Sequence, residues 1–288
     1  MDGVIIKAYG GFYFVRAVDR ELKCTIRGKV RRQYGQVLVG DRVRVVETGD
    51  GQGVVEALLL RRCALTRPPV ANVDQAVIIF SFTEPEPNAV LLDRFLVQAQ
   101  AAGVDPVICF NKLDLAGPGE CAILEHYERA GHPLLQVSAK TGANIERLRE
   151  ILRGRISVFA GPSGVGKSSL LNALQPGLKL KTGEVSRKLK RGRHTTRHVE
   201  LIPLAGGFVA DTPGFSSLQL PPMSRQELAG YFPEFTAVGE QCRFADCLHR
   251  DEPGCAVKQA VQLGRLSPLR YRHYLEFLDE VINGERRY

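Results

Sequence analysis

Residues 161–169 form a glycine-rich stretch, Gly-Pro-Ser-Gly-Val-Gly-Lys-Ser-Ser, that fits the phosphate-binding pattern G-x-x-x-x-G-K-[ST]. Glycines let successive backbone N–H groups turn inward around an anion, the lysine brings a mobile positive charge to the outer phosphates, and the next hydroxyl suits Mg²⁺. An apolar run precedes the stretch and a helical pattern follows it, which is the context that the motif requires. The residues expected to hold a nucleoside polyphosphate are Gly161, Pro162, Ser163, Gly164, Val165, Gly166, Lys167, Ser168 and Ser169.

Two further polar motifs bear on which base the nucleotide carries. Asn111-Lys112-Leu113-Asp114 follows an expected strand over 107–110, and Ser138-Ala139-Lys140 follows another over 134–137. The Asp114 carboxylate can only accept hydrogen bonds, and guanine presents an N1–H and an N2 amino group side by side, which adenine does not. The sequence therefore predicts a pocket that takes GTP and refuses ATP.

A cluster of thiols near the C-terminus has the composition of a metal site. Cys242, Cys247, His249 and Cys255 follow the spacing C-x4-C-x-H-x5-C, which brings the four ligands of a closed structural zinc site within fourteen residues. A disulfide would leave His249 and one thiol unexplained, and free thiols are the remaining alternative. We expect one structural Zn²⁺, with the other four cysteines as small buried core residues.

The elements that must position these residues begin with an N-terminal β segment. Residues 3–60 alternate polar and apolar side chains in about five short runs with glycine turns between them, and no helical pattern intervenes. Five short strands predict a small barrel that resembles an OB-fold. A basic stretch within it would supply charge and stacking for single-stranded nucleic acid, with a solvated loop as the alternative. Its members are Arg27, Lys29, Arg31, Arg32 and Tyr34.

Consecutive prolines in the stretch 66–69 indicate a linker, after which strand-like and helical patterns alternate as far as Asp211. This alternation predicts a doubly wound α/β sheet with its ligand at the carboxyl ends of the strands. Helical patterns over 225–231 and 268–281 follow, the second carrying a run of basic and aromatic residues that suits a solvated face. We divide the chain into a barrel at 1–68, an α/β domain at 69–220 and a helical zinc domain at 221–288.

The motif order is unusual for a GTPase. Asp211-Thr212-Pro213-Gly214 follows an expected strand, and the pair Thr195-Thr196 lies between it and the phosphate loop. Together with the phosphate loop and the two base motifs, these resemble the five motifs of GTPases. In an ordinary GTPase the phosphate loop comes first, whereas here both base motifs precede it. The domain is therefore expected to be circularly permuted, with the old termini joined near residues 152–156.

A barrel, a permuted GTPase domain and a Cys-Cys-His-Cys module together resemble the ribosome small-subunit-dependent GTPase A family, over essentially the whole chain. The resemblance implies GTP hydrolysis coupled to late maturation of the 30S ribosomal subunit, with binding to 16S ribosomal RNA. It implies that GTP or GDP, Mg²⁺ and zinc are bound at the positions named above. The alternatives are a GTPase acting on another RNA target, and an RNA-binding scaffold with a vestigial pocket, against which the intact Lys167, Ser168, Asp211 and Asp114 argue.

Catalysis is the least regular part of the pattern. Phe215 stands where Ras-like GTPases have the glutamine that orients the attacking water, and it has no donor or acceptor. In an extended segment residues two apart face the same side, so His194 can point toward the γ-phosphate if Thr196, rather than Thr195, reaches Mg²⁺. The expected catalytic residues are His194, Thr196, Lys167, Asp211 and Gly214, with contact to RNA or simple exposure to solvent as the alternatives for His194.

Composition agrees with a polyanionic partner. The 288 residues carry a formal net charge of +8, and basic residues crowd the segment 179–197. With 44% hydrophobic residues and no apolar run near the ~20 residues that span a bilayer, we expect a cytoplasmic, monomeric protein without a membrane partner.

Overall fold

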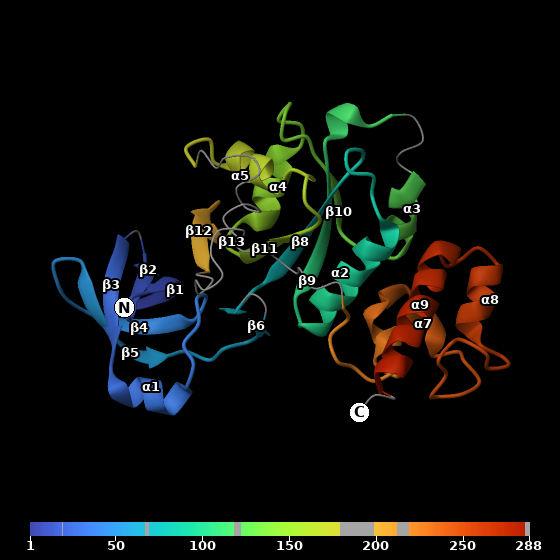
Figure 1. Ribbon diagram of the computed structural model, residues 1–288, viewed down its shortest axis with the longest axis horizontal. Coiled ribbons are helices and arrows are strands. Elements are labelled where there is room, and N and C mark those ends of the chain that lie inside the picture. The colour runs from blue at the N-terminus through green and yellow to red at the C-terminus, as the bar shows by residue number, and fades with distance from the viewer. Residues whose placement is uncertain (19, 67–68, 118–121, 179–198, 212–218, 286–288) are drawn as a thin grey trace.

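The computed structural model describes residues 1–18, 20–66, 69–117, 122–178, 199–211 and 219–285. Figure 1 shows three parts in a row: a barrel formed by the start of the chain, a central sheet flanked by helices, and a group of helices at the C-terminal end. Among the described residues, no helix is both long enough and apolar enough to cross a lipid bilayer.

The barrel consists of five strands, as expected. They are β1 (Asp2–Tyr9), β2 (Phe12–Ala17), β3 (Arg20–Ile26), β4 (Arg42–Gly49) and β5 (Gln52–Leu58). Their order is β1-β2-β3-β5-β4, and a pairing of β1 with β4 closes the ring. Alternate side chains of these strands, such as Ile5, Val15 and Val45, are completely buried inside it. This is the five-stranded closed barrel that the sequence predicted.

The expectation that no helix interrupts the barrel segment is wrong. Gly28–Tyr34 forms a short helix, α1, between β3 and β4. Only Val30 of its residues is buried, so the helix has no repeating apolar face for a periodicity argument to detect. The basic stretch is therefore helical, and its Lys29, Arg31 and Arg32 are exposed on α1.

The central sheet continues directly from the barrel. Its order is β10-β9-β8-β11-β13-β12, and β12 pairs with β1 of the barrel at Lys7 and Glu200. The first five of these strands are parallel, and β12 is antiparallel to β13. The strands are β8 (Gln75–Ser81), β9 (Asp105–Asn111), β10 (Leu134–Gln136), β11 (Ile156–Ala160), β12 (Glu200–Leu204) and β13 (Gly207–Asp211).

Helices cover both faces of this sheet. One face packs on α2 (Ala89–Ala101) and α3 (Ala122–Arg129), and the other packs on α4 (Ile145–Leu152) and α5 (Lys167–Leu174). Strand β8 is a continuous apolar run because helices cover it on both faces. Ile78 and Phe80 pack on the side of α2 and α3, and Val77 and Ile79 pack on the side of α4 and α5. Only residues 153–155 separate α4 from β11, at the place where the sequence predicted the joined termini.

The stretch between barrel and sheet is more ordered than a linker. Two short strands, β6 (Ala64–Thr66) and β7 (Pro69–Ala71), pair antiparallel, and Val70 bridges back to Val39 of the barrel segment. A Cβ on Gly40 would lie 2.1 Å from the Ala71 carbonyl oxygen, so that position requires glycine. The described part of this stretch is therefore fixed against the barrel.

The C-terminal part contains more helix than the sequence predicted. The expected helix over 225–231 is a single 3₁₀ turn, η2 (Leu228–Tyr231), and two unpredicted helices follow, α7 (Pro233–Gly239) and α8 (Ala256–Gln262). Both have seven residues, too few to establish a helical period. The expected terminal helix is present as α9 (Pro268–Glu285).

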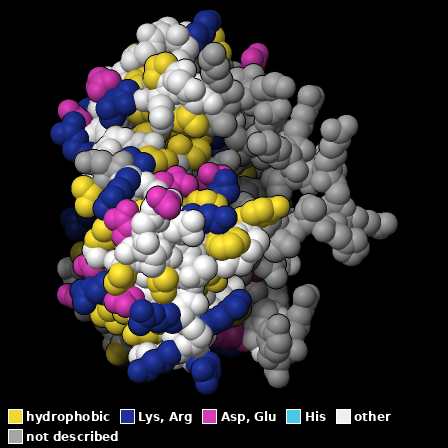
Figure 2. Space-filling model, turned by 90° about the vertical axis from the view of Figure 1, so that its left-hand side faces the viewer, with side chains coloured by type: hydrophobic (Ala, Val, Ile, Leu, Met, Phe, Trp, Pro, Cys, Tyr) yellow, Lys and Arg dark blue, Asp and Glu magenta, His cyan; other side chains and the backbone are white. Residues whose placement is uncertain are grey.

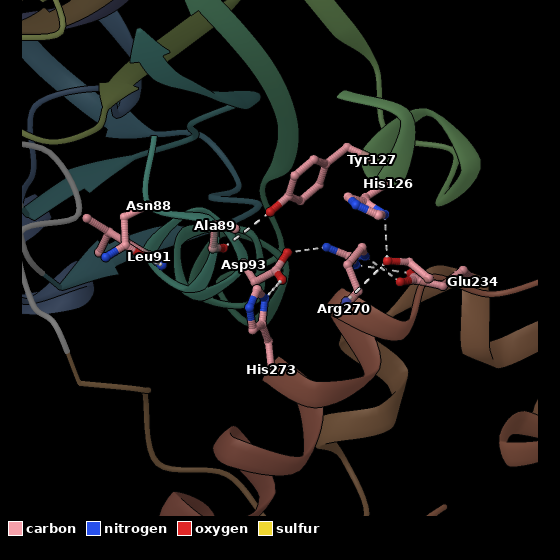
Figure 3. A network of polar contacts seen from close by, with 10 residues as sticks. Asn88, Ala89, Leu91, Asp93, His126, Tyr127, Glu234, Arg270 and His273 are labelled. Carbon is pink, nitrogen blue, oxygen red and sulfur yellow. Dashed lines mark hydrogen bonds and ion pairs between the residues drawn. The ribbon is translucent and has the colours of Figure 1, made fainter. Parts of the chain in front are cut away.

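The charged residues of helix α9 do not all lie on a solvated face, because Arg270 and His273 enter a buried polar network against α2 (Figure 3). Arg270 donates to the carboxylates of Asp93 on α2 and Glu234 on α7, and His273 Nδ1 lies 2.5 Å from Asp93 Oδ2. Arg270 is 1% exposed and Asp93 is 0% exposed. Although burial alone would lower it, these two carboxylates raise the pKa of Arg270, so a charged arginine joins the C-terminal helices to the central domain.

Candidate nucleotide site and metal centre

The phosphate loop lies between β11 and α5, as the motif requires. Two of its glycines have no room for a side chain: a Cβ on Gly161 would lie 2.0 Å from the Ile79 carbonyl oxygen, and one on Gly166 would lie 2.4 Å from Asn111 Nδ2. Both have positive φ, at 135° and 93°, which glycine adopts without strain. Backbone N–H groups can therefore approach an anion at the start of α5.

Lys167 lies across this loop and donates to the carbonyl oxygens of Gly161 at 2.8 Å and Pro162 at 2.7 Å. Burial lowers the pKa of Lys167 to about 8, since the loss of surrounding water disfavours the charged ammonium. Ser168, the next residue, is buried at 8% exposure. The loop holds a positive charge that an arriving phosphate would stabilise.

Asn111 joins the base-recognition motifs to the phosphate loop. It is 2% exposed at the end of β9, its Nδ2 donates to the Val165 carbonyl at 2.9 Å, and its Oδ1 accepts from the Ala139 N–H at 3.1 Å. A further bond runs from the Leu113 N–H to the Val137 carbonyl at 3.0 Å. The structure thus brings together three motifs, in which the bonded residues Asn111 and Val165 are 54 positions apart in the sequence.

Asp114 is held ready to accept hydrogen bonds. Ser138 Oγ donates to its Oδ1 at 2.5 Å, and Lys140 Nζ lies 3.6 Å from its Oδ2. The Ser138 hydroxyl, followed by weaker effects from Lys140, holds the pKa of Asp114 below its usual value, so the carboxylate stays ionised. The Thr141 N–H donates to Ser138 Oγ at 3.1 Å and fixes that hydroxyl in turn.

The cysteine cluster has the geometry of a four-ligand site. The ligand atoms of Cys242, Cys247, His249 and Cys255 all lie within 4.8 Å of one another. Cys242 Sγ is 3.6 Å from His249 Nδ1 and 4.0 Å from Cys255 Sγ, and Cys255 Sγ is 3.5 Å from the same nitrogen. Tetrahedral zinc with bonds of about 2.3 Å to sulfur and about 2.0 Å to nitrogen separates its ligands by similar distances, so these residues fit the ion.

Three residues around this cluster were missed by sequence reasoning. The Glu252 carboxylate accepts from the N–H groups of Leu248 and Arg250, both at 2.9 Å. The Tyr271 and Tyr274 hydroxyls of α9 donate to the carbonyls of His249 and Leu248, both at 2.7 Å. Tyr271 and Tyr274, which the sequence analysis assigned to a solvated helix face, thus hold the backbone of the cysteine loop. No sequence pattern indicates this role, because it depends on how α9 packs against the loop.

The barrel has an aromatic and basic face that the sequence analysis also missed. Adjacent strands place Lys7 beside Phe14 and Tyr9 beside Phe12, and Lys23 Nζ lies 4.0 Å from the Phe12 ring centre. Tyr9 is 62% exposed. Figure 2 views the molecule from the barrel side and shows Lys and Arg side chains interspersed with hydrophobic ones. The strand alternation on β1 and β2 is the signal that could have found this face.

The expected catalytic residues fall largely outside the described part of the chain. His194, Thr195, Thr196, Gly214 and Phe215 do so, as does the basic segment 179–197. Asp211 is the last residue of β13, which adjoins β11 and its phosphate loop in the sheet. Lys167 is the one expected catalytic residue whose side-chain contacts are defined.

Comparisons with known proteins match the whole chain. Residues 58–221 match the family model described as RsgA GTPase, and residues 2–55 match that of the RsgA N-terminal domain. The chain is 52% identical to the protein named Small ribosomal subunit biogenesis GTPase RsgA from Moorella thermoacetica, with 100% of each chain covered. It is 48% identical to the protein of that name from Carboxydothermus hydrogenoformans, with 99% of each chain covered.

Two solved structures have the same architecture. The structure of YloQ, described as a circularly permuted GTPase, superimposes with a TM-score of 0.86 at 40% sequence identity, and the match covers 100% of this chain and 96% of the YloQ chain. That of YjeQ from Thermotoga maritima is 39% identical with a TM-score of 0.86 and covers 98% of both chains. The expected fold class, a permuted GTPase domain between a barrel and a helical module with a Cys/His cluster, is confirmed.

Proposed function

Because this chain belongs to the RsgA GTPase family, we propose that it hydrolyses GTP to GDP and phosphate during biogenesis of the small ribosomal subunit. The observation that carries the proposal is the position of Asn111, whose amide bonds both to the phosphate loop and to the Ser138-Ala139-Lys140 loop. A base recognised by Asp114 and a phosphate chain on Gly161–Ser169 would then belong to one nucleotide. The 30S subunit and its 16S ribosomal RNA are the proposed partners, in the cytoplasm, with the protein acting as a monomer.

Guanine selectivity follows from the ionised Asp114. Its two oxygens can accept from guanine N1–H and the N2 amino group, and an adenine would leave the carboxylate unpaired. Competition between GDP and ADP for the isolated protein tests this assignment. Equal affinity for the two nucleotides would contradict it.

Two ions complete the proposed assembly. Ser168, and Thr196 from the segment before β12, would hold Mg²⁺, which supplies charge stabilisation for phosphoryl transfer. Cys242, Cys247, His249 and Cys255 would hold one structural Zn²⁺, which would tie the cysteine loop together, while Tyr271 and Tyr274 attach that loop to α9.

For catalysis we propose that Lys167 moves from its two carbonyls to the outer phosphates, and that Asp211, the last residue of β13, and Gly214, three residues later in the sequence, serve the γ-phosphate. His194 would orient the attacking water, because Phe215 cannot. His194→Ala should then lower hydrolysis stimulated by the subunit on the order of 10²-fold and leave GTP binding intact. Single-turnover hydrolysis with saturating 30S subunits measures this, and equal rates for the two proteins would remove His194 from the mechanism.

The aromatic and basic barrel face is the proposed RNA contact, together with the exposed lysine and arginines of α1. Exposed aromatic rings stack on unpaired bases, and the cations beside them meet phosphates. Sedimentation with 30S subunits at stepped salt should show affinity falling steeply, as release of counterions requires. Binding to 50S subunits with the same strength would favour a different RNA target.

A further inference from the structure

The loop between β8 and α2, residues 82–87, contacts the base motif of the nucleotide site and lies next to its phosphate loop. Lys112 Nζ of the base motif donates to the Glu84 carbonyl, and the Phe82 N–H donates to the Asn111 carbonyl at 3.3 Å. On the other side, a Cβ on Gly164 of the phosphate loop would lie 3.5 Å from Pro85 Cδ. The 82–87 loop therefore forms a side wall between the base motif and the phosphate loop.

This loop is held in place from within the sheet. Ser81, the last residue of β8, is 0% exposed, and its Oγ donates to the Pro85 carbonyl at 2.9 Å. Phe82 is 3% exposed, and its ring centre lies 5.3 Å from that of Phe110 on β9. The Ser81 hydroxyl and the Phe82 ring thus determine where the Glu84 carbonyl and the Pro85 ring lie.

The bond between Lys112 and Glu84 has a consequence for nucleotide binding. Lys112 precedes Asp114 by two residues and has a left-handed backbone with φ of 62°. With its ammonium tied to the wall, its four-carbon stem extends beside the position where Asp114 would hold a base, and it can cover apolar ring surface there. Releasing the Glu84 carbonyl would release that stem.

We propose that Ser81 is a positioning residue for the guanine nucleotide, acting through the 82–87 loop on Lys112 and on the phosphate loop. This inference rests on the proposed GTPase function and identifies what fixes the side of its pocket. GDP and GTP share the base and the inner phosphates, so the wall stabilises both equally. It sets how tightly nucleotide is retained, and it leaves the rate of the chemical step unchanged.

The test compares Ser81→Ala with Ser157→Ala in the full-length protein. Ser157 is a matched control because it is also a fully buried serine of the same sheet with one side-chain partner, Gln75 at 2.9 Å, and lies toward the amino end of β11. Ser81→Ala should raise the dissociation constants of GDP and GTP by the same factor, about threefold to tenfold, with kcat at saturating GTP unchanged. Ser157→Ala should change neither constant, and thermal unfolding of both variants records their stability.

A double-mutant cycle with Lys112→Met tests the route. If Ser81 acts through Lys112, Ser81→Ala should weaken GDP binding less in the Lys112→Met background than in the wild type. Two results would overturn the role of Ser81 and leave the GTPase assignment standing, provided that the wild-type protein binds GDP. One is that the two serine variants bind GDP equally well, and the other is that the effects in the cycle are fully additive. Wild-type protein that binds no guanine nucleotide would overturn both.

Discussion

Nucleotide affinity should fall as the pH rises above neutrality, because Lys167 has to be charged to serve the phosphates. Burial lowers its pKa to about 8 in the nucleotide-free chain, where its ammonium donates to two carbonyls. A bound polyphosphate places negative charge beside the ammonium and raises that pKa. Binding is then coupled to proton uptake, so affinity is greatest below the pKa of the free protein and is lost as the pH rises through it.

The size of the effect follows from the two pKa values. With a free pKa of about 8 and a bound pKa well above the pH range tested, the dissociation constant of GDP should rise about fourfold between pH 7 and about pH 8.5. At pH 8 about half a proton should be taken up per nucleotide bound. Keeping Lys167 charged in the nucleotide-free site costs on the order of 3 kcal/mol, a cost that the phosphates offset.

Calorimetric titration with GDP, in buffers of different ionisation enthalpy at fixed salt and Mg²⁺, measures the affinity and the proton uptake together. The range stops at about pH 8.5, below the ionisation of guanine itself. Lys167→Met is the control, and it should bind more weakly with little dependence on pH. A wild-type affinity that is constant over this range, with no proton uptake, would refute the reasoning.

Three other predictions concern the base, the metal and the buried network. Asp114→Asn should weaken GDP binding and improve binding of xanthosine diphosphate, whose C2 carbonyl accepts from the new amide, and a competition assay that finds GDP still preferred would contradict the assignment. Cys247→Ser should lower the zinc content measured by elemental analysis, whereas the half-buried Cys63→Ser should not; full zinc in both variants would argue against the four-ligand site. Arg270→Met leaves Asp93 and Glu234 buried without their cation and should cost about 3–5 kcal/mol in urea unfolding. Arg225→Met, whose partner Glu285 is partly exposed, should cost about 1 kcal/mol or less, and equal losses would mean that the buried network has no special weight.

The sequence predicted the parts of this molecule that depend on local pattern. Strand-ending motifs such as Asn111 and Asp114 could be placed because a run of buried β residues and a polar motif are adjacent in the chain. The cysteine spacing predicted the cluster for the same reason. The parallel order of β8, β9 and β11 followed from alternation with helices.

Features that depend on distant contacts could not be predicted. Arg270 meets Asp93 across 177 residues, and a charged helix residue gives no sign in the sequence that it is buried. Helix α1 was missed because a single buried residue, Val30, has no period. The 82–87 loop was missed because it meets the nucleotide site through backbone groups and a proline ring, none of which forms a recognisable motif.

The most direct test of the account is steady-state GTP turnover by the full-length protein alone, with purified 30S subunits and with purified 50S subunits. We expect slow hydrolysis by the protein alone, because Phe215 replaces the water-orienting glutamine, and a rate at least tenfold higher with 30S but not with 50S subunits. Turnover that neither subunit changes, or that 50S subunits stimulate as strongly as 30S, would contradict the assignment to the small subunit.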